Sequence, residues 1–210
     1  MTDERQRGVP RLPEALVRRP RLNALLDDAG SIVIVRALRG WGKTTLVADW
    51  LRGLDQDTTT SVWIDVTADL SDRSQFTRYL RRRMQGAGLT IAPATGDSSP
   101  SMIELHEALF ALDHGRAAVF VLDGLDNLTD GSLVSDLISL VSKHHNLRLV
   151  ACTRVPHPIE PLASIVSSSR LIQTRDLRFT PDEAEELAVT MRIPITPARF
   201  TWGPEVGHLT

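Results

Sequence analysis

A short glycine-rich segment, ALRGWGKTT at residues 37–45, constrains this chain more than any other part of its sequence. A β-branched run at residues 31–37 leads into the segment, and residues 44–54 follow it with apolar side chains at helical spacing. Gly40 and Gly42 allow the backbone to turn so that successive N–H groups face an anion, and the positive end of the helix dipole supports the same charge. The segment therefore predicts a phosphate-binding loop between a strand and a helix.

The other side chains of the loop suit a magnesium-bound nucleoside triphosphate. Lys43 supplies a mobile positive charge for the β- and γ-phosphates, Thr44 offers a hydroxyl to Mg²⁺, and Thr45 is placed for the α-phosphate. The segment follows the Walker A pattern G-x-x-x-x-G-K-[ST], except that Ala37 stands where the first glycine is expected. Trp41 is a candidate for covering the nucleotide. The alternative is a glycine-rich turn with an exposed lysine, but the strand before it and the helix after it favour the phosphate loop.

A candidate magnesium ligand lies about eighty residues later, after the most apolar strand of the chain. Residues 117–122 form this strand, and Asp123 follows it directly. A carboxylate there matches the Walker B position, which holds Mg²⁺ opposite Thr44. Asp126 is the nearest further carboxylate that could orient an attacking water. The alternative is an aspartate that merely starts a turn, which the joint presence of both motifs disfavours.

A cation follows another predicted buried strand, residues 147–153. Arg154 lies there at the carboxyl side of the strand, where ligands bind in open α/β sheets. It could contact the γ-phosphate, or it could be a solvated loop arginine, and the sequence leaves both interpretations open. The predicted catalytic residues are therefore Lys43, Asp123, Asp126 and Arg154.

Strands and helices alternate along most of the chain. The predicted strands cover residues 31–37, 61–66, 117–122, 147–153 and 171–174, and the predicted helices cover residues 21–28, 44–54, 71–85, 101–112, 131–144 and 181–191. This alternation predicts the α/β class, with the three-layer α/β/α architecture of a P-loop NTPase and a mainly parallel central sheet. We expect residues 1–20 to form an N-terminal arm, residues 21–192 the P-loop NTPase core, and residues 193–210 the start of a truncated helical region.

The composition excludes several other classes of protein. Hydrophobic residues make up 42%, as in ordinary globular proteins, and a formal net charge of -2 argues against non-specific coating of nucleic acid. The single cysteine, Cys152, cannot form an internal disulfide and suits a reducing cytoplasm. No apolar stretch approaches the ~20 residues that cross a bilayer, so a membrane partner is not expected. No metal-ligand spacing connects His144 or His145 to His106 or His114.

The residues resemble the STAND class of P-loop ATPases, in particular the amino-terminal ATPase domain of large LuxR-type transcriptional activators similar to the maltotriose-responsive regulator. The resemblance rests on residues 19–22, 37–45, 61–65, 73–80 and 176–184. Loops of that family often begin with alanine and carry an aromatic residue between their glycines, as Ala37 and Trp41 do here. The sequence DGLD at residues 123–126 departs from the usual paired acids and is more similar to the NACHT pattern. This departure leaves the water-activating residue open.

The resemblance implies ATP or ADP with Mg²⁺ as cofactors, and slow ATP hydrolysis that serves a regulatory switch. It also implies that Arg19 helps to hold adenine, so the predicted nucleotide-binding residues are Arg19, Ala37, Gly40, Trp41, Gly42, Lys43, Thr44 and Thr45. The domain could also self-associate. Sensor and helix-turn-helix regions would follow Thr210, so DNA would be bound only by regions absent from this sequence. The alternatives are a phosphotransferase or fast NTPase of another P-loop class, or a degenerate interaction domain without nucleotide.

Overall fold

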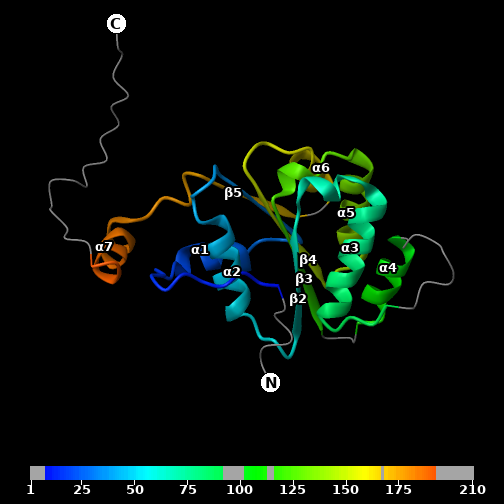
Figure 1. The fold of residues 1–210 in the computed structure, drawn as a ribbon, viewed down its shortest axis with the longest axis horizontal. Coiled ribbons are helices and arrows are strands. Elements are labelled where there is room, and N and C mark those ends of the chain that lie inside the picture. Colours follow the sequence, from blue (N-terminus) through cyan, green and yellow to red (C-terminus); the bar gives the residue numbers. More distant parts are fainter. Residues whose placement is uncertain (1–7, 92–101, 113–115, 167, 193–210) are drawn as a thin grey trace, which may run out of the picture. The chain divides into compact units, whose positions relative to one another are not determined.

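The computed structural model describes residues 8–91, 102–112, 116–166 and 168–192 (Figure 1). These residues form two compact units, one of residues 8–12 and 19–178 and the other of residues 13–18 and 179–192. The region expected at residues 193–210 lies outside the described residues. The expected domain boundaries stay predictions.

The first unit is built on five parallel strands in the order β2-β3-β4-β1-β5. They are β1 (Ile32–Arg36), β2 (Thr59–Asp65), β3 (Ala117–Asp123), β4 (Leu147–Thr153) and β5 (Ser169–Gln173). Four strands are buried along most of their length, as expected of apolar runs covered on both faces, whereas the first three residues of the edge strand β5 are exposed. The predicted parallel sheet is confirmed.

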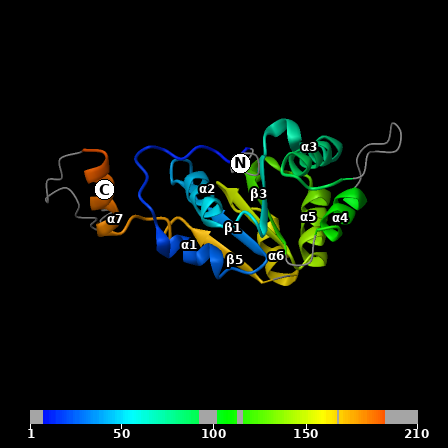
Figure 2. The same cartoon turned by 90° about the horizontal axis from the view of Figure 1, so that it is seen from below.

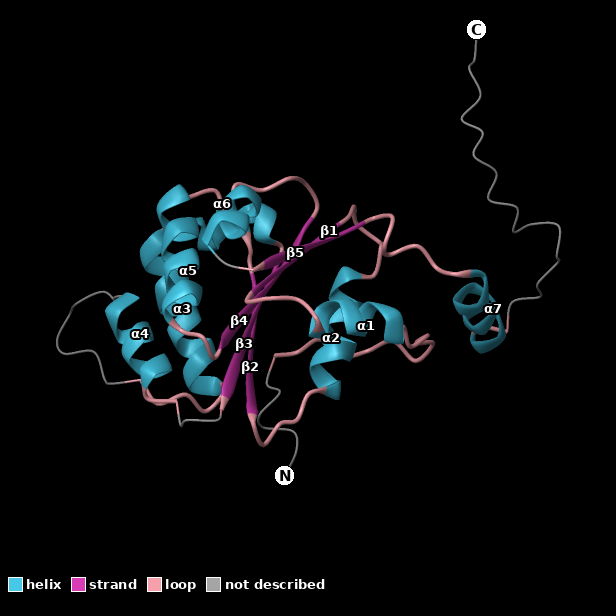
Figure 3. Ribbon diagram, turned by 180° about the vertical axis from the view of Figure 1, so that it is seen from behind, coloured by secondary structure: helices cyan, strands magenta, loops and turns pink. Residues whose placement is uncertain are grey.

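Helices cover both faces of this sheet, which Figures 1 and 2 show from two directions. Helices α1 (Pro20–Asp27) and α2 (Lys43–Gly53) cover one face, where they pack against Val33 and Val35 of β1. The other face carries Ile32 and Ile34 of β1 and is covered by α3 (Arg73–Gly86), α4 (Met102–Phe110), α5 (Gly131–Lys143) and α6 (Ile159–Val166). Alternate residues of β1 thus contact opposite layers, and the three-layer α/β/α architecture is confirmed (Figure 3).

Helix α6 is an element that the sequence pattern did not predict. Pro156 and Pro158 precede it and Pro161 lies within it, and such a cluster of prolines is typical of an irregular loop. Pro161 is the third residue of α6, where the backbone N–H has no partner within the helix, so the proline costs no helical hydrogen bond. Ile159 and Ala163 of α6 are fully buried against the sheet. Tertiary packing therefore supports a helix that local composition disfavours.

The second unit contains helix α7 (Pro181–Thr190). The Thr180 hydroxyl accepts a hydrogen bond from the Glu183 N–H at 3.2 Å, and the Glu183 carboxylate accepts one from the Thr180 N–H at 3.0 Å. This capping box confirms the helix start that the sequence predicted. In the part of the chain that the structure describes, every helix is too short or too polar to traverse a bilayer.

A hydrogen bond joins two histidines that are far apart in the sequence, one on α4 and one at the end of α5. Nδ1 of His106 on α4 lies 2.9 Å from Nε2 of His144, which follows the last turn of α5. His144 is 2% exposed and packs against the ring of Phe110. Burial lowers the pKa of both imidazoles, and the nearby Lys143 ammonium adds to the effect. Burial therefore favours the neutral form of both imidazoles.

Acid should weaken the fold through this pair. The unfolded chain takes up these protons at a higher pH than the folded chain, so the free energy of unfolding should decrease as the pH falls from about 7 to about 5. His106→Gln should flatten this dependence when urea unfolding is measured at both pH values. The exposed neighbour His145, changed to Gln, serves as the control and should keep the original dependence. An unchanged pH dependence in the His106 variant would contradict the prediction.

Candidate functional site

The predicted phosphate loop connects β1 to α2 at the carboxyl edge of the sheet. Gly40 and Gly42 have φ values of 85° and 74°, in the left-handed region that favours glycine. A Cβ atom at either position would meet no atom within 4 Å, so the need for glycine is conformational rather than steric. Gly42 directly precedes α2, so the N-terminus of this helix points its free N–H groups at the loop. The turn has the form of an anion cradle.

Ala37 opens the loop without needing the freedom of glycine. Its N–H donates to the Thr153 carbonyl at 3.2 Å, which extends the pairing of β1 with β4, and its side chain is 2% exposed. Among the described residues other than glycine, only Arg192 has a positive φ, so Ala37 lies in an ordinary backbone region. An alanine therefore fits where the Walker A pattern has its first glycine.

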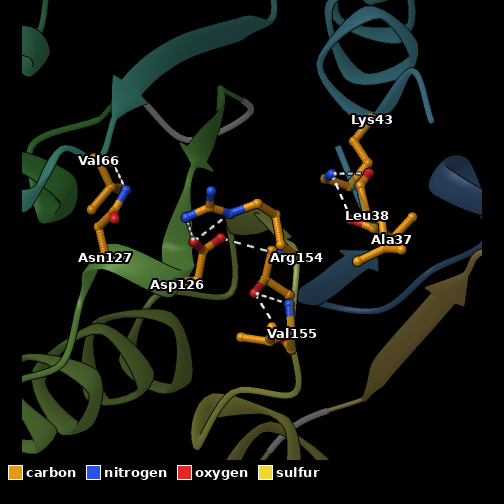
Figure 4. Close-up of polar contacts among 9 residues, drawn as sticks. Ala37, Leu38, Lys43, Val66, Asp126, Asn127, Arg154 and Val155 are labelled. Atoms are coloured by element: carbon orange, nitrogen blue, oxygen red, sulfur yellow. Dashed lines mark hydrogen bonds and ion pairs between the residues drawn. The ribbon is translucent and has the colours of Figure 1, made fainter. Parts of the chain in front are cut away.

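The side chain of Lys43 closes over the loop that precedes it. Its Nζ atom donates to the carbonyl oxygens of Ala37 at 2.7 Å and Leu38 at 3.0 Å (Figure 4). These bonds hold the ammonium group at the loop, where phosphate oxygens would be stronger, charged acceptors. Thr45 lies in the first turn of α2 and is half-buried. Trp41 is half-buried against the apolar cluster of α1 and α2, and its predicted contact with nucleotide stays a prediction.

Thr44 and Asp123 meet across the sheet. The Thr44 hydroxyl donates to the Asp123 carboxylate at 2.7 Å, although β4 lies between the strands that carry the two motifs. Burial raises the pKa of Asp123, and the nearby Asp65 carboxylate raises it further, whereas Thr44 and Lys43 act in the opposite direction. A hydroxyl and a carboxylate oxygen are ligands that Mg²⁺ prefers. The arrangement fits a divalent cation beside a polyphosphate.

Asp126 and Arg154 are brought together, but as partners of each other. The Arg154 backbone N–H donates to Oδ1 of Asp126 at 3.1 Å, and its guanidinium Nε donates to Oδ2 at 2.7 Å, with Nη2 contacting the same oxygen (Figure 4). Burial would raise the pKa of Asp126, but the hydrogen bonds and charge of Arg154 outweigh it and lower that pKa. The Asp126 side chain is 6% exposed and that of Arg154 is 50% exposed. The predicted role of Asp126 in orienting water and that of Arg154 in contacting the γ-phosphate therefore depend on each other.

The turn after β3 holds the ends of β2 and β3 together. Gly124 has φ 86°, and a Cβ atom there would lie 2.7 Å from the Val66 carbonyl oxygen. That oxygen accepts a hydrogen bond from the Asn127 side chain at 2.7 Å (Figure 4). The Val66 N–H donates to the Asp123 carbonyl at 2.7 Å. Asp123 thus projects from a fixed backbone.

Arg19 lies at the start of α1, beside the segment that follows β5. Its guanidinium donates to the carbonyls of Leu177 at 2.8 Å and Arg178 at 2.7 Å. These bonds tie the two segments together, and the contact with adenine stays a prediction. A hollow of about 300 Å³ lies by the loop and includes Ala37 and Arg154 in its lining. A larger hollow of about 420 Å³ lies at the opposite edge, where the strands begin.

Some residues at this edge were missed by the sequence analysis. Arg36 donates to Glu160 at 2.6 Å and so joins the end of β1 to α6. Glu160 also accepts a hydrogen bond from the His157 N–H at 3.1 Å. Because the sequence did not predict α6, it gave no reason to pair Arg36 with Glu160. Asp65 and Asn127 were also not proposed, although Asp65 lies near the end of one predicted strand and Asn127 lies shortly after another.

Known proteins resemble this chain in sequence and in structure. A family model described as origin of replication binding protein matches residues 17–104, which include the phosphate loop and β2 but not Asp123. The chain is 27% identical over 201 residues to the serine/threonine-protein kinase PknK of Mycobacterium tuberculosis, a match that covers 86% of this chain. It spans 18% of the length of that relative.

Two solved structures give the fold. One is a Signal Transduction ATPase with Numerous Domains (STAND) protein with a tetratricopeptide repeat sensor from Pyrococcus horikoshii, with a TM-score of 0.55, 17% identity, and coverage of 90% of this chain and 27% of that chain. The other is the Aeropyrum pernix ORC1 protein in complex with DNA, with a TM-score of 0.55, 21% identity, and coverage of 89% and 51%. This chain has the fold of a P-loop NTPase.

Gly124→Ala should destabilise this fold. The side chain would require both a left-handed backbone and a shift of the Val66 carbonyl, so we expect the free energy of unfolding to fall by roughly 1–3 kcal/mol in urea denaturation. Gly131, the first residue of α5, has open space around it and provides the control. Gly131→Ala should change the stability by less than about 0.5 kcal/mol. Equal effects of the two substitutions would contradict the strain at Gly124.

Proposed function

We propose that this P-loop NTPase binds Mg·ATP and acts as a regulatory switch domain of the STAND type, with slow ATP hydrolysis. One observation carries the proposal: the hydrogen bond that joins Thr44 of the loop to Asp123 of β3. It supports a shared site, because it joins the glycine-rich turn to a carboxylate that lies 79 residues later in the chain. Both parts are needed to hold a magnesium-bound triphosphate.

The roles of the site residues follow from their positions. The amides of the turn at Gly40 and Gly42 bind phosphate oxygens, and Lys43 exchanges its carbonyl acceptors for the β- and γ-phosphates. Thr44 and Asp123 hold Mg²⁺, which neutralises charge on the phosphates when it is bound. Thr45, in the first turn of α2, is placed for the α-phosphate.

Slow hydrolysis is consistent with the carboxylates near Asp123. Gly124 follows Asp123 directly, so the next position carries no carboxylate. As long as Arg154 stays paired with Asp126, the lowered pKa of this carboxyl makes it a weak base for activating water. Binding therefore has more support in this chain than rapid turnover does, which favours a switch over a metabolic enzyme.

A role within a longer signalling protein is supported by the lengths of the relatives. The chain matches 18% of a protein kinase and 27% of a STAND protein with a repeat sensor. We infer that this domain controls attached sensor or output regions. The full protein would then be a cytoplasmic transcriptional regulator of the LuxR type. DNA would be bound by such regions, since the domain has a formal net charge of -2. The ATPase domain itself could associate with further copies.

Lys43→Ala should weaken Mg·ATP binding by about tenfold or more, because one charge-assisted contact contributes roughly 1.5–3 kcal/mol. The chain contains only one other lysine, Lys143, an exposed residue at the end of α5. Lys143→Ala is therefore a matched control and should bind with the original affinity in titration calorimetry. If both variants bind as well as the original chain, the site assignment is wrong.

The same two lysines allow a direct test on the unaltered chain. An amine-reactive reagent should modify both Lys43 and Lys143, and Mg·ATP should protect only Lys43 in peptide mass spectrometry. Absence of both binding heat and protection would favour an interaction domain without nucleotide. Turnover of many ATP molecules per second would favour a phosphotransferase or fast NTPase of another class.

Arg154→Gln should reduce the preference for ATP over ADP. If the guanidinium leaves Asp126 for the γ-phosphate, its loss should weaken Mg·ATP binding by roughly tenfold and Mg·ADP binding much less. The control is Arg175→Gln, an arginine on the segment after β5 whose side chain is 79% exposed. Equal losses for the two nucleotides in calorimetry would remove Arg154 from the γ-phosphate contact.

A further inference from the structure

The end of β2 places a second carboxylate beside the candidate magnesium ligand. Asp65, the last residue of β2, pairs in register with Asp123, the last residue of β3. Residues in register on parallel strands project to the same face of a sheet. Asp65 and Asp123 therefore extend side by side from neighbouring strands at the edge where the phosphate loop lies.

The face on which Asp65 lies follows from the buried residues before it. Trp63, two residues earlier, belongs to the apolar cluster of α1 and α2, as do Val119 and Val121 before Asp123. Alternate residues of a strand share a face, so both carboxylates are on the side of α2. The hydrogen bond from Thr44, in the first turn of α2, confirms this for Asp123.

The Asp65 carboxylate is oriented by a rigid partner. The indole Nε1 of Trp63 donates to its Oδ1 atom at 2.9 Å, and Trp63 is 0% exposed. Asp65 itself is exposed, so the carboxylate is fixed on one side and open to solvent on the other. The bond from the Val66 N–H to the Asp123 carbonyl holds the two strand ends at a constant separation. Such a fixed, half-hydrated carboxylate is suited to accept hydrogen bonds from water around a cation.

The electrostatics at the strand ends also favour a cation. Asp65 and Asp123 are paired in register, so their two negative charges lie on neighbouring strand ends and repel each other. By contrast, Asp126, the other carboxylate that follows β3, is already neutralised by Arg154. Asp65 and Asp123 thus form the pair whose repulsion a divalent ion would relieve.

We propose that Asp65 is a positioning residue of the Mg·ATP site, held by Trp63 beside Asp123 to receive water bound to the metal. This inference rests on the proposed function and adds a residue to the same site. The residue after Asp123 is Gly124, which has no carboxylate to accept a hydrogen bond from metal-bound water. The carboxylate at the end of β2 takes this role instead. Asp65 acts on the nucleotide through the metal and not by direct contact.

The test compares nucleotide binding with and without the metal. Asp65→Asn keeps an oxygen acceptor for Trp63 but removes the charge. It should weaken Mg·ATP binding by about threefold to tenfold in calorimetry, because one negative charge near the cation is lost. In EDTA the same variant should bind ATP as well as the original chain or better, because one charge that repels phosphate is gone. Binding of Mn²⁺ in the presence of ATP, followed by electron paramagnetic resonance, gives a readout independent of hydrolysis.

Two further variants make the result specific. Asp69→Asn changes an exposed carboxylate four residues later and should alter neither titration. Asp65→Glu keeps the charge but moves it by one methylene group. This variant should retain part of the gain in ATP affinity that Mg²⁺ provides. Equal affinities of the Asp65→Asn variant and the original chain in Mg²⁺, or equal losses with and without Mg²⁺, would overturn this inference alone. No binding of Mg·ATP by the original chain would instead overturn the proposed function.

Discussion

The site depends on the parallel order of the sheet, which brings all strand ends to one edge. Strand β4 lies between β1 and β3, so the loop after β1 and the carboxylate after β3 are separated by one strand. Helix α2 bridges this interval, because its first turn projects Thr44 onto Asp123 at 2.7 Å. Buried apolar strands make this geometry rigid, since a shift of one residue in register would move every buried side chain to the opposite face.

Much of this arrangement could be predicted from local sequence. The β-branched run before the loop, the apolar run before Asp123 and the apolar positions of α2 each have a period that identifies one element. The parallel sheet follows from their alternation. The missing first glycine also has a local explanation in the structure, since Ala37 continues the pairing of β1 with β4 and keeps an ordinary backbone conformation.

What could not be predicted depends on pairing between distant segments. Arg154 meets Asp126 across 28 residues, and His106 meets His144 across 38 residues, and no local period encodes either contact. The register of β2 against β3, which places Asp65 beside Asp123, is set by burial on both faces rather than by either strand alone. Helix α6 was missed for a related reason, because its stability comes from Ile159 and Ala163 packing on a sheet that a local window does not include.

A switch requires two states of similar free energy that a ligand distinguishes. In the proposed switch, the pair of Asp126 and Arg154 is a contact that a nucleotide could exchange, because half of the Arg154 side chain is exposed. Opening this pair would let the exposed guanidinium bind a phosphate oxygen instead of the carboxylate. Opening would also free the Asp126 carboxylate, whose side chain is 6% exposed, and a buried unpaired charge is unfavourable. The same movement that lets Arg154 reach a phosphate must therefore also rearrange the turn around Asp126. Because Asn127 in that turn binds the end of β2, a change at the nucleotide would be transmitted to neighbouring strands.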